Sequence, residues 1–268
     1  MPRRPLRVIL IALAALAVLL PTAALTAQED APVTLLVFHR PPYYILKDGK
    51  PAGGFLLTAA LLVFEKAGIP VTVREMPPGR IIATLADNKT QACGVGWFKT
   101  PQREAFAHLS LPLYQDQPLA VAVGSSARGI PTEPPPTLGD LLRTEKTWGL
   151  REGFSYGKEA DQAFLQYPAN RVKRFSDTHH MVTLLAQGRL DALLIDPEEL
   201  SWIVASQPEL GQKIRLVPLA GVPPGADRHI LCSQAVSPEV MVRLDTAIRA
   251  FAPTQQYRDL TTFSYPYK

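Results

Sequence analysis

The chain has 268 residues, with 28 Lys and Arg against 24 Asp and Glu, and a formal net charge of +4. This length allows one large domain or two modest domains with a sizeable core. The small charge, and the absence of a basic run interleaved with aromatic residues, argue against a nucleic-acid surface. We therefore expect no nucleic-acid partner, and instead a small-molecule ligand or a protein.

The first 27 residues have the order of a secretory signal peptide. Three arginines precede an apolar run over residues 8–20, and small residues follow it. The run is short for a membrane span, which needs about 20 residues. We predict cleavage after Ala24 or Ala27 and a mature protein in the periplasm. Removing the three arginines, with no acid in the segment, takes the net charge from +4 to +1 (4 − 3).

Beyond the leader, predicted strands and helices alternate almost throughout the chain. This pattern is typical of α/β layers, and we expect mostly parallel sheets. Two βα halves of similar size indicate two lobes with a cleft between them. The predicted strands cover 33–39, 71–76, 91–96, 110–114, 119–124, 147–152, 171–175, 190–196, 214–219 and 229–234. The predicted helices cover 55–68, 80–88, 138–143, 155–167, 178–188, 197–206, 238–251 and 254–260.

The segment GVGWFKTPQREAF, from Gly94 to Phe106, places an arginine where a helix disfavours one. Thr100 and Pro101 predict a helix N-cap and first helical position. Arg103 then lies in the first turn, where the helix dipole favours Asp or Glu. An anion from outside the local sequence would resolve this conflict. The alternative is a side chain that extends into solvent or pairs with Glu104 or another surface acid.

The order of four segments resembles the periplasmic solute-binding proteins, family 3, that bind polar amino acids for ABC-type uptake transporters. These segments are RPPYYILKDGKPAGGF, LADNKTQACGVGWFKTPQREAFAHLSLPLY, WGLREGFSYG and LLAQGRLDALLIDPEEL. The resemblance covers essentially the whole mature chain. It implies a type II fold, with two doubly wound sheets joined by two crossover strands, near Tyr114–Pro118 and Arg228–Ile230. The implied limits are 28–115 and 229–268 for the first lobe and 116–228 for the second.

The resemblance also implies roles for three residues. Arg103 matches the arginine that pairs with a ligand carboxylate, for which its planar fork is suited. Asp196 matches the aspartate that takes the ligand's ammonium group, and Ser155 matches a hydroxyl that contacts the carboxylate. Asp196 precedes Pro197 and Glu199, however, so it can equally serve as a helix cap. Ser155 can also be only a cap.

Several positions depart from the family pattern. The first helix opens with GFLLT and lacks the family's two acids, and Gly96 and Phe98 replace two hydroxyl residues. The family's ligand-stacking aromatic falls near Arg40, close to Tyr43, and Arg80 enters the next helix on the cleft side. These changes favour a ligand with more than one negative group, or an aromatic acid stacked on Trp97, Phe98 or Tyr43. The same aromatic residues could instead belong to the core or to the rim.

The two cysteines, Cys93 and Cys232, can be buried thiols or one disulfide. The family topology makes their strands neighbours, so the resemblance favours a Cys93–Cys232 disulfide. We expect no metal, because adjacent His179 and His180 point in different directions on a helix. We also expect no cofactor.

Catalysis is the rival function. Some relatives of this fold are cyclohexadienyl dehydratases, for which Asp196, Glu152 or His39 could supply a proton. The sequence contains no cysteine beside a plausible base, no zinc-type histidine pair and no glycine-rich phosphate loop. We therefore expect a monomeric, non-enzymatic receptor that serves a membrane permease or, as the alternative, a sensor.

Overall fold

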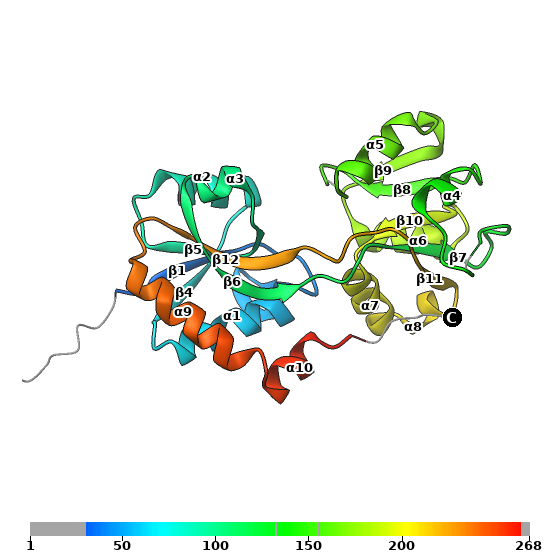
Figure 1. Ribbon diagram of the computed structural model, residues 1–268. Coiled ribbons are helices and arrows are strands. Elements are labelled where there is room, and N and C mark those ends of the chain that lie inside the picture. Colours follow the sequence, from blue (N-terminus) through cyan, green and yellow to red (C-terminus); the bar gives the residue numbers. More distant parts are fainter. Residues whose placement is uncertain (1–30, 132, 155, 264–268) are drawn as a thin grey trace, which may run out of the picture. The chain divides into compact units, whose positions relative to one another are not determined.

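The computed structural model describes residues 31–131, 133–154 and 156–263. Within these residues the chain forms two five-stranded sheets and a two-stranded hairpin (Figure 1). The predicted signal peptide and Ser155 lie outside the described residues. The described part therefore starts immediately before the first predicted strand.

The first sheet has the strand order β4-β1-β5-β12-β6. Strand β1 pairs in parallel with β4 and β5, whereas β12 is antiparallel to both β5 and β6. Its strands are β1 (Val33–Val37), β4 (Val71–Glu75), β5 (Ala92–Phe98), β6 (Ala107–Gln115) and β12 (Asp227–Ser233).

Helices cover both faces of the first sheet (Figure 1). Successive strand residues point to opposite faces, so Leu35 packs in a cluster with α1 and α9, and Leu36 packs in a cluster with α2. The helices of this half are α1 (Phe55–Lys66), α2 (Pro78–Asp87), α3 (Pro101–Glu104), α9 (Pro238–Phe251) and α10 (Gln255–Thr261).

The second sheet has the strand order β11-β7-β10-β8-β9. Alternation again divides the core: Leu193 packs with α6 and α7, and Leu194 packs with α4 and α5. The strands are β7 (Ala120–Gly124), β8 (Trp148–Arg151), β9 (Val172–Phe175), β10 (Ala192–Ile195) and β11 (Ile214–Pro218). The helices are α4 (Leu138–Leu142), α5 (Lys158–Gln166), the 3-10 turn η1 (Ala169–Arg171), α6 (Thr178–Ala186), α7 (Pro197–Ser206) and α8 (Pro208–Gly211).

The expectation of mostly parallel sheets is wrong, because both sheets are mixed. In the first sheet β12 runs antiparallel between β5 and β6, and in the second sheet β7 runs antiparallel to β10 and β11. The cause is the path of the chain, which leaves the first sheet after β6 and returns to it as β12. The two connections, residues 116–119 and 219–226, are the crossovers of the predicted α/β two-sheet fold, which is confirmed. The first lies where it was predicted, but the second precedes its predicted place, because Arg228–Ile230 already belongs to β12.

Local sequence signals explain most helix starts. The side chains of Thr100, Asp177 and Ser237 accept a bond from the backbone three residues later, and Thr137 forms a capping box with Asp140. The predicted helix over 155–167 starts later, since α5 begins at Lys158. The prediction also missed the hairpin of β2 (Ile45–Lys47) and β3 (Lys50–Gly53).

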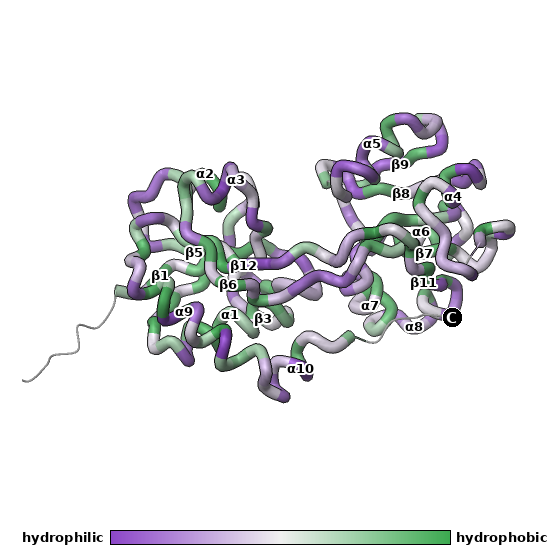
Figure 2. Tube along the Cα trace, in the orientation of Figure 1, coloured by the Kyte–Doolittle hydropathy of each residue, from purple (hydrophilic) through white to green (hydrophobic). Residues whose placement is uncertain are grey.

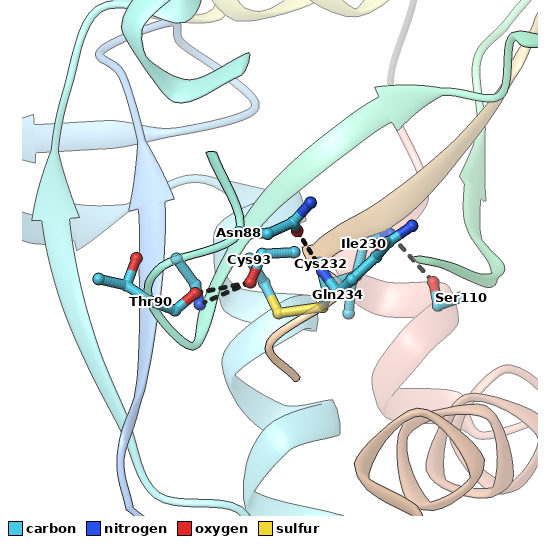
Figure 3. Close-up of a disulfide and its surroundings, with 9 residues drawn as sticks. Asn88, Thr90, Cys93, Ser110, Ile230, Cys232 and Gln234 are labelled. Atoms are coloured by element: carbon cyan, nitrogen blue, oxygen red, sulfur yellow. Dashed lines mark hydrogen bonds between the residues drawn. A yellow bond between two sulfur atoms is a disulfide. The ribbon is translucent and has the colours of Figure 1, made fainter. Parts of the chain in front are cut away.

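The predicted disulfide between Cys93 and Cys232 is confirmed (Figure 3). The two residues face each other in the antiparallel register of β5 and β12, with Cα atoms 4.0 Å apart. Next to the disulfide, the backbone N–H of Gln234 donates to Asn88 Oδ1 at 2.6 Å. The disulfide thus joins the early part of the first sheet to the strand that returns after the second sheet.

Hydrophobic residues concentrate along the strands of both sheets, whereas the helices contain hydrophilic and hydrophobic residues in turn (Figure 2). No helix in the described part of the chain has the length and apolar character required to cross a membrane.

Candidate functional site

Arg103 lies in a one-turn helix whose start is as predicted. Thr100 is the N-cap, its Oγ1 accepts from the Arg103 backbone N–H at 3.3 Å, and Pro101 takes the first position. Because α3 spans one turn, its dipole is small, and the guanidinium itself is the main positive group here. The pairing with Glu104 that we considered is wrong, since Glu104 binds Lys99 at 2.9 Å.

The Arg103 guanidinium is held by uncharged groups. Its Nη1 donates to the backbone oxygen of Phe98 at 2.6 Å, and it lies over the Trp97 ring, 4.9 Å from the centroid. Among the described residues no carboxylate lies within ion-pair distance of it. Partial burial lowers the pKa of Arg103 below its usual value. Arg103 is therefore a half-buried cation that lacks an acidic partner in this part of the chain.

Glycine next to Trp97 allows the end of β5 to pack closely. Gly96 has a φ of +75°, and a Cβ there would lie 1.9 Å from the Tyr44 hydroxyl. That hydroxyl donates to Val95 O at 2.8 Å. The replacement of a family hydroxyl position by Gly96 thus has a packing reason, and Phe98, at the strand end, is 38% exposed.

Arg40 is the central cation of the site and is only 8% exposed. Its Nη2 donates to Asp196 Oδ2 at 2.8 Å, and its Nε donates to Glu199 Oε1 at 2.7 Å. Burial opposes its charge, but Glu199 and Asp196 outweigh burial and raise the pKa of Arg40. Arg40 thus joins the segment after β1 to the start of α7.

Asp196 occupies the N-cap position of α7, but its side chain makes no capping hydrogen bond. The interpretation of Asp196 as a cap alone is therefore wrong, because the carboxylate is used in the ion pair with Arg40. Glu199 Oε2 accepts from the Thr178 hydroxyl at 3.0 Å, so both Glu199 oxygens have partners. The ligand role of Asp196 remains a prediction.

Arg228 is a second buried arginine, and sequence reasoning missed it as a site residue. Its Nε donates to Asp116 Oδ1, and its Nη1 donates to Gly96 O at 3.1 Å. Both side chains of the pair are nearly inaccessible to solvent. The pair joins the start of the first crossover to the beginning of β12, 112 residues apart in sequence. The sequence signal was a run of polar residues, Asp227 to His229, directly before the apolar residues of this strand.

Arginines and aromatic rings alternate through the site in a continuous series of contacts, which we call the arginine–aromatic stack. Adjacent members have guanidinium-to-centroid distances between 4.3 and 4.8 Å. In order of contact it consists of Phe98, Arg228, Tyr43, Arg40, Phe154 and Arg151. The stack links the first-sheet residue Phe98 to the second-sheet residue Arg151.

Burial changes the protonation of two carboxyl groups beside the stack. Burial raises the pKa of Glu198 to about 7, although the Gln117 backbone N–H and the Tyr114 hydroxyl, each 2.7 Å from Oε1, oppose the shift. Burial likewise raises the pKa of Asp116 to about 6, opposed by Arg228. Glu198 therefore changes charge near neutral pH.

The raised pKa of Glu198 predicts a pH-dependent stability. Because the folded state holds this proton more tightly than the unfolded state, the stabilisation is complete below about pH 4.5 and is lost as pH rises through about 7. We expect the free energy of unfolding to fall by about 2–3 kcal/mol between pH 5 and 8. Urea unfolding at several pH values measures this change. Glu198→Gln, which keeps an oxygen acceptor, should flatten the profile, and an equally steep profile would contradict the assignment.

Three buried side-chain atoms in or near the stack have no hydrogen-bond partner among the described residues. They are the Tyr43 hydroxyl, Trp97 Nε1 and Glu198 Oε2. Since buried polar groups normally have partners, the two donors among them, on Tyr43 and Trp97, are candidate contacts for a ligand.

Two cavities lie near these residues. One of about 290 Å³ has Arg40, Arg151, Thr178, Glu199 and Trp202 in its wall. A larger, mainly apolar one of about 480 Å³ is lined by residues of the second half, Tyr156 and Leu194 among them, and includes neither Arg40 nor Arg103. The smaller cavity suits a polar ligand better, because charged groups line it, although Arg103 is not in its wall either.

The remaining candidates are two predicted ligand residues, Arg80 and Ser155, and two residues considered as proton donors, His39 and Glu152. Arg80 is exposed in the first turn of α2, with no contact to the stack, and Ser155 lies outside the described residues. His39 Nδ1 accepts from the Leu46 backbone N–H at 3.1 Å and Glu152 is exposed, so the structure does not assemble these two with Asp196 as proton donors.

The chain matches a family model described as bacterial extracellular solute-binding proteins, family 3, over residues 36–227. This span is more than half of the chain and contains Arg40, Arg103 and Asp196. No curated protein sequence matches the chain.

Solved structures share the fold at low identity. The second substrate-binding domain of Lactococcus lactis GlnP, in an open conformation, has a TM-score of 0.64 and 16% identity over 88% of this chain and 95% of that chain. The arginine-, lysine-, histidine-binding protein ArtJ of Geobacillus stearothermophilus has a TM-score of 0.63 and 17% identity, over 86% of this chain and 93% of that chain. An ancestral arginine-binding protein bound to arginine has a TM-score of 0.62 and 18% identity, over 87% of this chain and 97% of that chain.

Proposed function

Because the chain belongs to family 3 of the bacterial extracellular solute-binding proteins, we propose that it is a periplasmic receptor for a small carboxylate-bearing ligand. The receptor closes on an amino acid or carboxylic acid and delivers it to an uptake transporter. The family is one of binding proteins, so an enzymatic role has no support from it.

Arg103 is the observation that carries this proposal. A half-buried guanidinium without an acidic partner among the described residues stabilises an external carboxylate, with which it can form two charge-assisted hydrogen bonds. Trp97 and exposed Phe98 offer apolar surface next to it. The unpartnered Trp97 Nε1 supplies a further donor.

Removing the Arg103 side chain is expected to weaken carboxylate binding on the order of a hundredfold, since two charge-assisted bonds are lost. The test is a thermal-shift screen of the mature protein against amino acids, dicarboxylates and aromatic acids. A ligand that binds the folded state alone raises the melting temperature.

Arg103→Ala should abolish the shift that the strongest ligand produces. Arg249→Ala removes the same charge from the exposed end of α9 and should leave the shift intact. Equal shifts in wild type and Arg103→Ala would reject the assignment of Arg103 as the carboxylate site.

A further inference from the structure

Arg40 satisfies the two acids that open α7, and this bears on the kind of ligand that the site accepts. Asp196 is 19% exposed and Glu199 is 7% exposed, so both carboxylates are largely removed from water. Such carboxylates require a cation close by. Arg40 supplies it with one hydrogen bond to each acid, at 2.8 and 2.7 Å.

The backbone and the neighbouring rings fix Arg40 in this position. Its backbone N–H and C=O both bond to Tyr44, each at 2.9 Å. Its guanidinium lies over the rings of Tyr43 and Phe154, 4.7 and 4.8 Å from their centroids. A side chain held at both its base and its tip does not move aside without loss of several contacts.

Each arginine of the site faces an acid except one. Arg40 and Arg151 face Asp196 and Glu199, with Arg151 Nη1 3.5 Å from Glu199. Arg228 pairs with Asp116. Arg103 alone among these arginines has no acid within ion-pair distance in the described residues. Glu198 has no cation beside it in this part of the chain, but it is fully buried and its Oε1 accepts from Tyr114 and Gln117. Arg103 can therefore take a negative group, whereas the partly exposed acid Asp196 already has its cation.

We propose that the ligand is a carboxylic acid without an ammonium group, because Arg40 occupies the place of a ligand cation. This inference rests on the proposed receptor function and narrows its substrate class. An ammonium-bearing ligand would have to compete with Arg40 for Asp196 and leave a buried arginine without its partner. Breaking one half of a buried ion pair predicts an affinity loss on the order of a hundredfold.

Matched pairs of ligands that differ by one ammonium group test this inference. The pairs are succinate and aspartate, glutarate and glutamate, propionate and alanine, and 3-phenylpropanoate and phenylalanine. Each is titrated against the wild-type mature protein at pH 7, and the melting temperature is measured. We expect the acid of at least one pair to raise the melting temperature and its amino-acid partner to give a clearly smaller shift.

Two variants show whether Arg40 itself causes the preference for the acid over its amino acid. Arg40→Met keeps an unbranched side chain but leaves Asp196 and Glu199 without their cation, so the amino acid of the responsive pair should become the preferred ligand. Arg249→Ala removes the same charge from the exposed end of α9 and should retain the wild-type order. If Arg40→Met does not fold, the comparison of acid and amino acid in the wild type decides.

The outcomes also distinguish this inference from the receptor function. If an amino acid shifts the wild type as much as its partner acid, the inference is overturned while the receptor function stands. An unchanged preference in folded Arg40→Met would overturn it as well. If no member of any pair shifts the wild type, both proposals lose their basis.

Discussion

Replacing Arg228 by methionine is expected to lower the free energy of unfolding by about 3–5 kcal/mol. The substitution leaves Asp116 buried without its cation and Gly96 O without its donor, while the volume of the side chain changes little. Rings of Tyr43 and Phe98 also lose the guanidinium that lies over them, at 4.3 and 4.7 Å. Urea unfolding followed by circular dichroism measures the loss.

Two comparisons show whether burial causes this effect. Arg228→Met/Asp116→Asn removes the unpaired charge and should recover part of the loss. Arg143→Ala breaks the Arg143–Asp140 pair on the exposed surface, where such pairs contribute about 0–1 kcal/mol. A loss in Arg228→Met no larger than in Arg143→Ala would contradict the description of Arg228–Asp116 as a structural ion pair.

Removing the disulfide with Cys93→Ala/Cys232→Ala is expected to lower the free energy of unfolding by about 2–5 kcal/mol. The bond closes a loop with a sequence separation of 139, and a loop of this size strongly restricts the unfolded chain. The measurement is the urea midpoint of the oxidised wild type and of the double variant.

A reductant provides the control for this second prediction. Reduced wild type should unfold at a similar midpoint to the double variant, and the reductant should leave the double variant unchanged. Identical midpoints for oxidised and reduced wild type would show that the Cys93–Cys232 bond contributes no stability.

Local signals made part of this molecule predictable from its sequence. Thr100 followed by Pro101 predicted a helix start, because capping depends on residues adjacent in the chain. Apolar alternation located nearly every strand. Such local patterns do not tell which strands become neighbours or in which direction they run. The antiparallel pairing of β7 and β12 with their neighbours was therefore not predicted, and mostly parallel sheets were expected instead.

The ion pairs of the site could not be predicted, because their partners are distant in sequence. Arg40 is separated from Asp196 by 156 residues and from Glu199 by 159. The motif around Asp196 had predicted a cap or a ligand contact, and neither alternative considered an arginine of the chain itself. The resemblance marked Arg40 as a departure from the family pattern. In the structure, Arg40 at this position forms the ion pairs with Asp196 and Glu199.

Arg40 and Arg103 show why residue type alone does not define a binding site. Both are partly or wholly buried arginines, but acids raise the pKa of Arg40, while burial without such acids lowers the pKa of Arg103. The first is an internal counter-ion, and the second has charge to offer an external anion. This contrast underlies both proposals.

The most direct test of the receptor proposal is a calorimetric titration of the strongest screened carboxylate into wild type and Arg103→Ala at pH 7. The account predicts saturable binding to the wild type and a dissociation constant raised about a hundredfold in the variant. A dissociation constant that is the same in both proteins would contradict the account.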